Sequence, residues 1–221
     1  MVAPQKTILV SETMDRLVVL PSVSWETYER LLADHPEPAS VRFSYDSGKL
    51  EIKVLSLRHE NPNRKLARLI EVLAEEMELD IEPAGSTTFQ REDLRKGFEP
   101  DSCFYIQNAE AIRGKEKVDL KIDPPPDLVI EIDVSSDSLD KFPIFASIGV
   151  PEAWRYDEGK VTIYKLEADS YVIAERSPTF PILTGEMVAQ FLEESAQMKS
   201  TAWLRRVREW AREQMKTQSP Q

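Results

Sequence analysis

The sequence has few of the residues on which several common kinds of catalysis depend. It contains one cysteine, two histidines and seven glycines in 221 residues. The single Cys103 cannot form an internal disulfide, and so few histidines and cysteines effectively exclude most catalysis by these side chains as well as zinc-like ligand spacing. Glycine-rich phosphate loops and a nucleophile elbow are absent too. The chemistry that remains belongs to carboxylates and lysines.

Long hydrophobic runs are also missing. No apolar stretch approaches the roughly 20 residues that a membrane-spanning helix needs, and residues 1–16 lack the basic segment and apolar core of a signal peptide. With 41% hydrophobic and 30% charged residues, the chain has the composition of a folded domain with a core of its own. We therefore expect a soluble, cytoplasmic protein without a membrane partner.

Basic residues are outnumbered, with 28 lysines and arginines against 39 acids and a net charge of −11. This balance argues against nucleic-acid binding through the overall electrostatic field of the protein. A polyanion would have to bind to a local cluster of basic residues. We interpret most basic clusters as solvated faces balanced by neighbouring acids. The clusters are Arg58, Arg64, Lys65 and Arg68; Arg91, Arg95 and Lys96; Arg113, Lys115 and Lys117; and Arg205, Arg206, Arg208 and Arg212.

The order of helical and extended patterns predicts an α/β domain with a mixed central sheet flanked by helices. Capping signals predict helices that begin after Ser24, after Asn61 with Pro62 in the first turn, and after Thr184. Further patterns predict a hairpin over 41–55, strands near 81–90, 101–107 and 127–134, a helix that ends at Gly149, and a strand meander over 152–176. We divide the chain into an extended lead-in (1–21), a main domain (22–183) and a long C-terminal helix with a frayed tail (184–221).

One strand pattern, DLVIEIDV at 127–134, carries two acids on a segment that otherwise looks buried. Alternation puts Glu131 and Asp133 on the face opposite Leu128, Ile130, Ile132 and Val134. At a spacing of about 7 Å and an effective dielectric constant near 20, two full charges repel by roughly 2 kcal/mol. A positive group is therefore expected close to them.

Asp101 begins the preceding strand pattern, and its carboxylate could approach that of Glu131 if the two strands are neighbours. Two carboxylates from separate strands, completed by waters, suit Mg²⁺ or Mn²⁺, which would polarise a phosphate and lower the pKa of a bound water. Lys141 lies ten residues beyond Glu131 and could orient that water or neutralise a developing charge.

This arrangement resembles the PD-(D/E)XK nuclease superfamily, which has the restriction-endonuclease-like fold. The blocks VSWETYERLL, HENPNRKLARLIEVL, GSTTFQRED, FEPDSCFYI, PPDLVIEIDVSSDSLDKF and IGVPEAWRYD, within residues 22–175, are similar to a large prokaryotic family of Uma-type restriction endonuclease domains. The resemblance implies a metal-dependent DNA endonuclease that uses a metal-activated water. It also implies Asp101 as the motif aspartate, Glu131 as the motif glutamate, and Glu60 as an acid from the first core helix. In the endonuclease hypothesis, the backbone carbonyl of Ile132 could add a further metal ligand.

The sequence departs from the superfamily pattern at position 133, where the usual lysine is an aspartate. The resemblance implies that Lys141, in the following helix, replaces that lysine, and we expect a metal ion and Lys141 to compensate both Glu131 and Asp133. Two other functions stay open: a non-catalytic binding or regulatory module with the nuclease fold, and a structural oligomer, such as a homodimer, formed through the C-terminal helix. His59 is interpreted as a helix-entry contact, and Glu60 as either a site residue or a helix-terminal acid.

Overall fold

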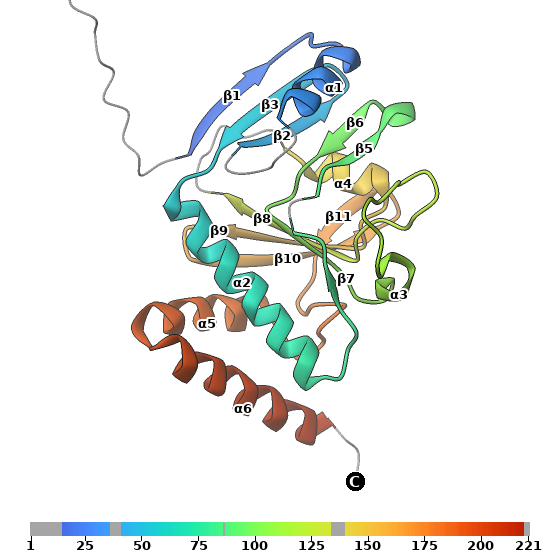
Figure 1. Ribbon diagram of the computed structural model, residues 1–221. Helices are drawn as coiled ribbons and strands as arrows, with labels where there is room; N and C mark the ends of the chain where they lie inside the picture. The colour runs from blue at the N-terminus through green and yellow to red at the C-terminus, as the bar shows by residue number, and fades with distance from the viewer. Residues whose placement is uncertain (1–14, 36–40, 86, 134–139, 219–221) are drawn as a thin grey trace, which may run out of the picture.

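The computed structural model describes residues 15–35, 41–85, 87–133 and 140–218. Its strands form two sheets (Figure 1). Sheet A consists, in spatial order, of β1 (Arg16–Leu20), β3 (Lys49–Val54), β2 (Val41–Asp46), β6 (Lys96–Phe98) and β5 (Phe89–Arg91). Sheet B consists of β11 (Ser170–Ile173), β10 (Lys160–Glu167), β9 (Glu152–Asp157), β8 (Leu128–Asp133), β7 (Ser102–Tyr105) and β4 (Glu82–Pro83). Within these described residues, β8 and β9 pair in parallel and the other strand pairings are antiparallel.

The helices complete the predicted α/β architecture. They are α1 (Trp25–Asp34), α2 (Leu57–Glu76), α3 (Ala109–Ile112), α4 (Phe142–Ile148), α5 (Gly185–Gln197) and α6 (Ser200–Gln218), with a short 3₁₀ turn at Glu92–Leu94. The helix α1 packs on sheet A, while α2 lies between sheet B and the C-terminal helices α5 and α6 (Figure 1). No helix in the described ranges has the length and apolar character needed to cross a membrane.

Sheet A is held by the hairpin that the sequence predicts. β2 and β3 are joined through Ser47 and Gly48, which both have positive φ, as a tight hairpin turn requires. Alternation puts one set of side chains under α1, where they form an aromatic cluster with Trp25 and Tyr28. That set is Phe43, Tyr45, Leu50 and Ile52. The opposite face of the hairpin is polar and turns toward the end of β8, because Lys53 donates to the carbonyl oxygen of Ile132.

Sheet B separates two other apolar clusters. In β8, Leu128, Ile130 and Ile132 pack on the side of α2, whereas Val129 packs on the side of α4. The alternation predicted for this strand is confirmed for these residues; Val134 lies outside the described residues. Glu131 therefore shares its face with Val129, at the end of the strand that sheet A covers.

The start of α2 differs from the sequence prediction. The helix begins at Leu57, with the Ser56 hydroxyl accepting from the backbone N–H of His59 at 3.4 Å, so Asn61 is not the cap. Pro62 lies inside the helix, where it removes one backbone donor. The early start gives α2 one more turn and places His59 on its buried face.

The C-terminal helical region is capped by Thr184, as predicted, and is then divided into α5 and α6 near Met198. Phe191, Trp203 and Val207 are fully buried in the same cluster as α2. At the outer edge Arg208 bonds Glu75, and Arg212 bonds Glu76, both on α2. The apolar stripe that could have formed an oligomer is thus covered by the protein's own domain. The lead-in that was expected to be extended contains the strand β1.

Candidate active site

The pairing of β7 with β8 sets Asp101 beside Glu131. Ser102 is opposite Ile130, so the position before β7 meets the one after Ile130. The Oδ2 atom of Asp101 accepts the backbone N–H of Ile132 at 2.8 Å and lies 3.0 Å from Nε2 of His59. Since an ionised carboxylate can only accept hydrogen bonds, His59 carries its proton on Nε2. Asp101 is consequently fixed in orientation by one strand and one helix.

Glu131 and Lys141 form the second half of the cluster. The Lys141 ammonium donates to Oε2 of Glu131 at 2.8 Å, and Oε1 of Glu51 lies 3.9 Å from the same ammonium. Lys141 is the N-cap residue immediately before α4, and its side chain is buried. The structure thus brings Asp101, Glu131 and Lys141 together at one end of β8. Their roles in metal binding and catalysis stay predictions.

Burial and charge act in opposite directions on these groups. Burial raises the pKa of Asp101, but the hydrogen bond from His59 and the charges of Lys53 and Lys141 outweigh it and hold this pKa well below its usual range. Burial raises the pKa of Glu131; Lys141 lowers it and Asp101 raises it again, which leaves it at about 7. Burial lowers the pKa of Lys141, but Glu131, Asp101 and Glu51 raise it above its usual range. Lys141 is therefore an ammonium at neutral pH.

Asp101 and Glu131 each have one carboxylate oxygen without a hydrogen-bond partner in the part of the chain that the structure describes. These oxygens are Oδ1 of Asp101 and Oε1 of Glu131, and both are buried. A buried oxygen of this kind is costly unless a donor or a cation meets it. Within the described ranges, no group of three or more histidine, cysteine or acidic side chains is placed to hold a metal. Two carboxylates with open coordination positions nevertheless fit Mg²⁺ or Mn²⁺, which retain several waters and favour oxygen ligands.

Ile132 contributes backbone atoms on both sides of the cluster. Its N–H is bound to Asp101, and its carbonyl oxygen accepts from Nζ of Lys53 at 3.0 Å. A carbonyl oxygen has two lone pairs, so one acceptor position remains. The Ile132 carbonyl, a metal ligand expected from the sequence, therefore lies near the two carboxylates. It already accepts a hydrogen bond from the Lys53 ammonium.

Glu60 is placed differently. Its carboxylate pairs with Arg64 one turn further along α2, and its side chain is 33% exposed. The neighbouring His59, and not Glu60, points toward Asp101. The charge next to Asp133 also differs from the expectation, because Arg155 on β9 pairs with Asp133 while Lys141 pairs with Glu131. The acids at 131 and 133 are thus compensated by separate cations.

The sequence did not predict several residues of the cluster as site residues, among them Glu51, Lys53, His59 and Asn63. Asn63 donates to the carbonyl oxygen of Asp101 at 3.0 Å and accepts from the hydroxyl of Ser102 at 2.8 Å. His59 and Asn63 are four residues apart and so share one face of α2, a spacing visible in the sequence. In β3, Glu51 and Lys53 alternate with the apolar Leu50 and Ile52. This alternation indicates in the sequence that one face of the β2–β3 hairpin is polar.

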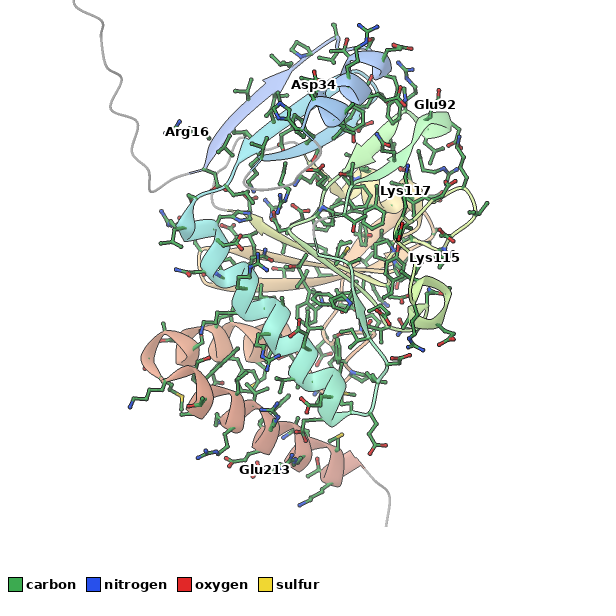
Figure 2. The ribbon with its side chains drawn as sticks, viewed as in Figure 1. Arg16, Asp34, Glu92, Lys115, Lys117 and Glu213 are labelled. Atoms are coloured by element: carbon green, nitrogen blue, oxygen red, sulfur yellow. The ribbon has the colours of Figure 1, made fainter. Side chains whose placement is uncertain are left out.

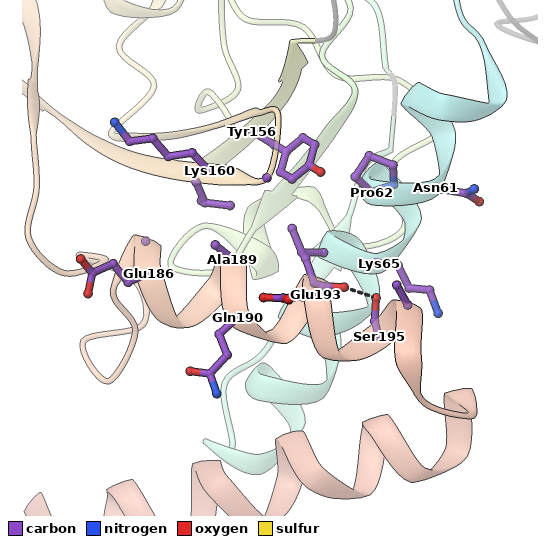
Figure 3. A pocket seen from close by; sticks show the side chains of 15 residues that line it. Asn61, Pro62, Lys65, Tyr156, Lys160, Glu186, Ala189, Gln190, Glu193 and Ser195 are labelled. Atoms are coloured by element: carbon purple, nitrogen blue, oxygen red, sulfur yellow. Dashed lines mark hydrogen bonds between the residues drawn. The ribbon is translucent and has the colours of Figure 1, made fainter. Parts of the chain in front are cut away.

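A cavity of about 900 Å³ lies elsewhere, between the first turns of α2, the turn that joins β9 to β10, and α5 (Figure 3). Lys65, Tyr156 and Glu193 are among the side chains that line it. Tyr156 is in register with Ile132, so this cavity is on the α2 side of sheet B, opposite the face of Glu131. No predicted site residue lines it.

The basic clusters are largely paired with acids. Arg113 contacts Asp80, Glu82 and Glu110, and Lys115 contacts Asp123. Figure 2 shows Lys115 and Lys117 beside α3 at one side of the molecule, away from Glu213 on α6. Other pairs are Arg64 with Glu60, Arg68 with Glu71, Arg91 with Asp93, Lys96 with Asp46, and Arg208 and Arg212 with acids of α2. These pairings agree with the interpretation of the clusters as balanced surfaces.

The fold is the restriction-endonuclease-like α/β fold, with the acidic cluster at the end of the central strands β7 and β8. The chain belongs to the Uma2 family, described as "Putative restriction endonuclease", whose family model matches residues 25–196. Among solved structures it is similar to a crystal structure titled as that of "a putative nuclease belonging to DUF820" from Anabaena variabilis ATCC 29413. The identity is 16% over 68% of this chain and 90% of that chain, with a TM-score of 0.47. The curated proteins contain no match.

Proposed function

We propose that the protein is a metal-dependent DNA endonuclease that hydrolyses phosphodiester bonds. The observation that carries this proposal is the pair of buried carboxylate oxygens without hydrogen-bond partners, Oδ1 of Asp101 and Oε1 of Glu131, next to a buried lysine. Membership of a family described as restriction endonucleases supports DNA as the substrate. Because the protein has a net negative charge, the phosphate backbone of the DNA has to bind to basic side chains or a metal ion near the site.

In the proposed reaction, Asp101, Glu131 and the carbonyl oxygen of Ile132 would hold Mg²⁺ or Mn²⁺. Such a cation polarises a phosphate oxygen and lowers the pKa of a water. His59 and the N–H of Ile132 keep Asp101 in one orientation, so that its Oδ1 faces the site. Lys141 neutralises the negative charge that develops on the phosphate while remaining paired with Glu131. The oxygen of a water forms the new bond to phosphorus as one ester bond breaks, the water loses a proton to solvent, and the leaving oxygen takes one up. Glu60 has no part in this scheme.

The direct test is nicking of supercoiled plasmid in the presence of Mg²⁺ or Mn²⁺, with EDTA as the metal-free control. Wild-type protein is expected to nick, and Lys141→Gln to be slower by about 100-fold, because one electrostatic contact to the transition state is worth about 10²–10³ in rate. Glutamine keeps a donor toward Glu131, which limits the loss of stability. Lys160→Gln, at an exposed position of β10, is the matched control and is expected to behave as the wild type.

Equal nicking by wild-type and Lys141→Gln protein would indicate a contaminating nuclease and would remove the support for this role of Lys141. A second function, the non-catalytic nuclease-fold module, is favoured by Asp133 at the usual lysine position and by its pairing with Arg155. It predicts that wild-type protein binds Mn²⁺ and still fails to nick plasmid at any metal concentration.

A further inference from the structure

The polar face of the β2–β3 hairpin is part of the same cluster. Arg42 is opposite Lys53, and Ser44 is opposite Glu51, and all four are buried. Buried charges are retained only where they find partners. Lys53 and Glu51 have partners beyond sheet A: Lys53 bonds the Ile132 carbonyl oxygen of β8, and Glu51 lies near Lys141, just before α4. Sheet A therefore supplies part of the site and is more than a cover over it.

Lys53 brings an ammonium group to a segment of β8 that has no lysine of its own. Position 133 is an aspartate, and Arg155 pairs with it. The Lys53 ammonium reaches the residue just before this position, at 3.0 Å from the carbonyl oxygen. Only 2% of Lys53 is exposed, and Asp15 at 3.5 Å is its nearest ion-pair partner in the described residues.

The Lys53 charge also acts on both carboxylates of the proposed metal site. Burial raises the pKa of Asp101 and of Glu131, and Lys53 is one of the charges that lower it in each case. The buried cluster as a whole contains five carboxylates, from Asp15, Glu51, Glu99, Asp101 and Glu131, and three cationic groups, from Arg42, Lys53 and Lys141. In their ionised forms these groups leave an excess of two negative charges, which one divalent cation would balance.

We propose that Lys53 is a positioning residue that holds the Ile132 carbonyl and sets the affinity of the site for its divalent cation. This inference rests on the proposed function. A cation bound by Asp101, Glu131 and Ile132 has to share the carbonyl oxygen with the Lys53 ammonium, and like charges this close repel each other. Lys53 therefore keeps the carbonyl oriented in the metal-free protein and makes metal binding weaker than the carboxylates alone would make it.

The test is Mn²⁺ titration by calorimetry at pH 7.5 and constant ionic strength. Lys53→Gln removes the charge but keeps a donor for the Ile132 carbonyl, and it is expected to lower the Kd for Mn²⁺ by about tenfold or more. Lys53→Arg keeps the charge and is expected to stay within about threefold of the wild type. Lys49→Gln removes a charge from an exposed position of the same strand and is the control for a general charge effect. A role in structure alone would not tighten metal binding.

Unchanged or weaker Mn²⁺ binding by folded Lys53→Gln protein would overturn the inference. If that variant does not fold, Asp15→Asn tests the same idea in the opposite direction, because it leaves Lys53 without its acid and is expected to raise the Kd severalfold; an unchanged Kd would again overturn it. If wild-type and Lys53→Gln proteins bind Mn²⁺ equally, the inference alone fails. If neither binds at millimolar Mn²⁺, the metal dependence of the proposed function fails as well.

Discussion

Replacing Glu131 by glutamine is expected to slow Mn²⁺-dependent nicking of supercoiled plasmid by about 100-fold to 1,000-fold. Glutamine has the shape of glutamate and can still accept from Lys141, so the loss comes from the missing negative charge on the proposed metal site. Each factor of ten in rate corresponds to about 1.4 kcal/mol of transition-state stabilisation. The same substitution is expected to weaken Mn²⁺ binding in calorimetry, because it removes one of the two carboxylates that we propose as ligands.

Glu60→Gln is the matched control for this experiment. Glu60 is an acid of the same type, but it is paired with Arg64 and partly exposed on α2. It is expected to leave both nicking and Mn²⁺ binding within about twofold of the wild type. Full activity of Glu131→Gln protein, with its metal dependence intact, would show that Glu131 is not a ligand and that the acidic cluster has another purpose.

Trp203→Ala is expected to lower the free energy of unfolding by about 3–5 kcal/mol, the usual cost of deleting a buried aromatic side chain. Trp203 is fully buried between α6 and α2, its indole N–H donates to the carbonyl oxygen of Phe191 at 2.8 Å, and the Lys65 ammonium lies 5.2 Å from its ring. Urea denaturation followed by circular dichroism measures the loss as a lower midpoint.

Ile122→Ala provides the comparison, because this side chain is 81% exposed and its removal is expected to change stability by less than about 0.5 kcal/mol. A Trp203→Ala protein as stable as the wild type would mean that α6 contributes little to the fold. Light scattering on the same sample gives the oligomeric state and tests whether exposing the stripe of α6 leads to association.

Much of the fold follows from local patterns in the sequence. The alternation in Leu128–Asp133 predicts both faces of β8, and Ser24 and Thr184 cap the helices that they were predicted to cap. These signals are local: a side-chain hydroxyl bonds a backbone N–H three residues on, and successive strand residues point to opposite faces. No knowledge of the rest of the chain is needed to use them.

The start of α2 was predicted wrongly because two caps compete there. Asn61 followed by Pro62 is a good local signal, but Ser56 begins the helix five residues earlier. The longer helix brings His59 to Asp101 and buries it, which is a tertiary contact between residues 42 positions apart. Such a contact can outweigh the loss of the one backbone hydrogen bond that Pro62 cannot donate.

Only part of the candidate site was predictable from the sequence. Asp101, Glu131 and Lys141 stand in motif-like positions along the chain, and the resemblance to a nuclease superfamily singled them out. Lys53 and Glu51 belong to no such motif, because what makes them site residues is the docking of sheet A against the end of β8. The partner of Asp133 was missed for the same reason: the parallel register of β8 and β9 brings Arg155 close to it.

Because the site combines residues of both sheets, it can form only at a late stage of folding. Lys53 and Ile132 are 79 residues apart, and their hydrogen bond forms only when the first sheet has settled on the second. A nascent chain that has folded no further than the β2–β3 hairpin lacks the pair of Asp101 and Glu131. A chain in which sheet A has not docked on sheet B has both of these acids without Lys53 of β3 beside them. The complete cluster, with Asp101 and Glu131 beside the lysine of β3, therefore forms only after both sheets have folded and docked.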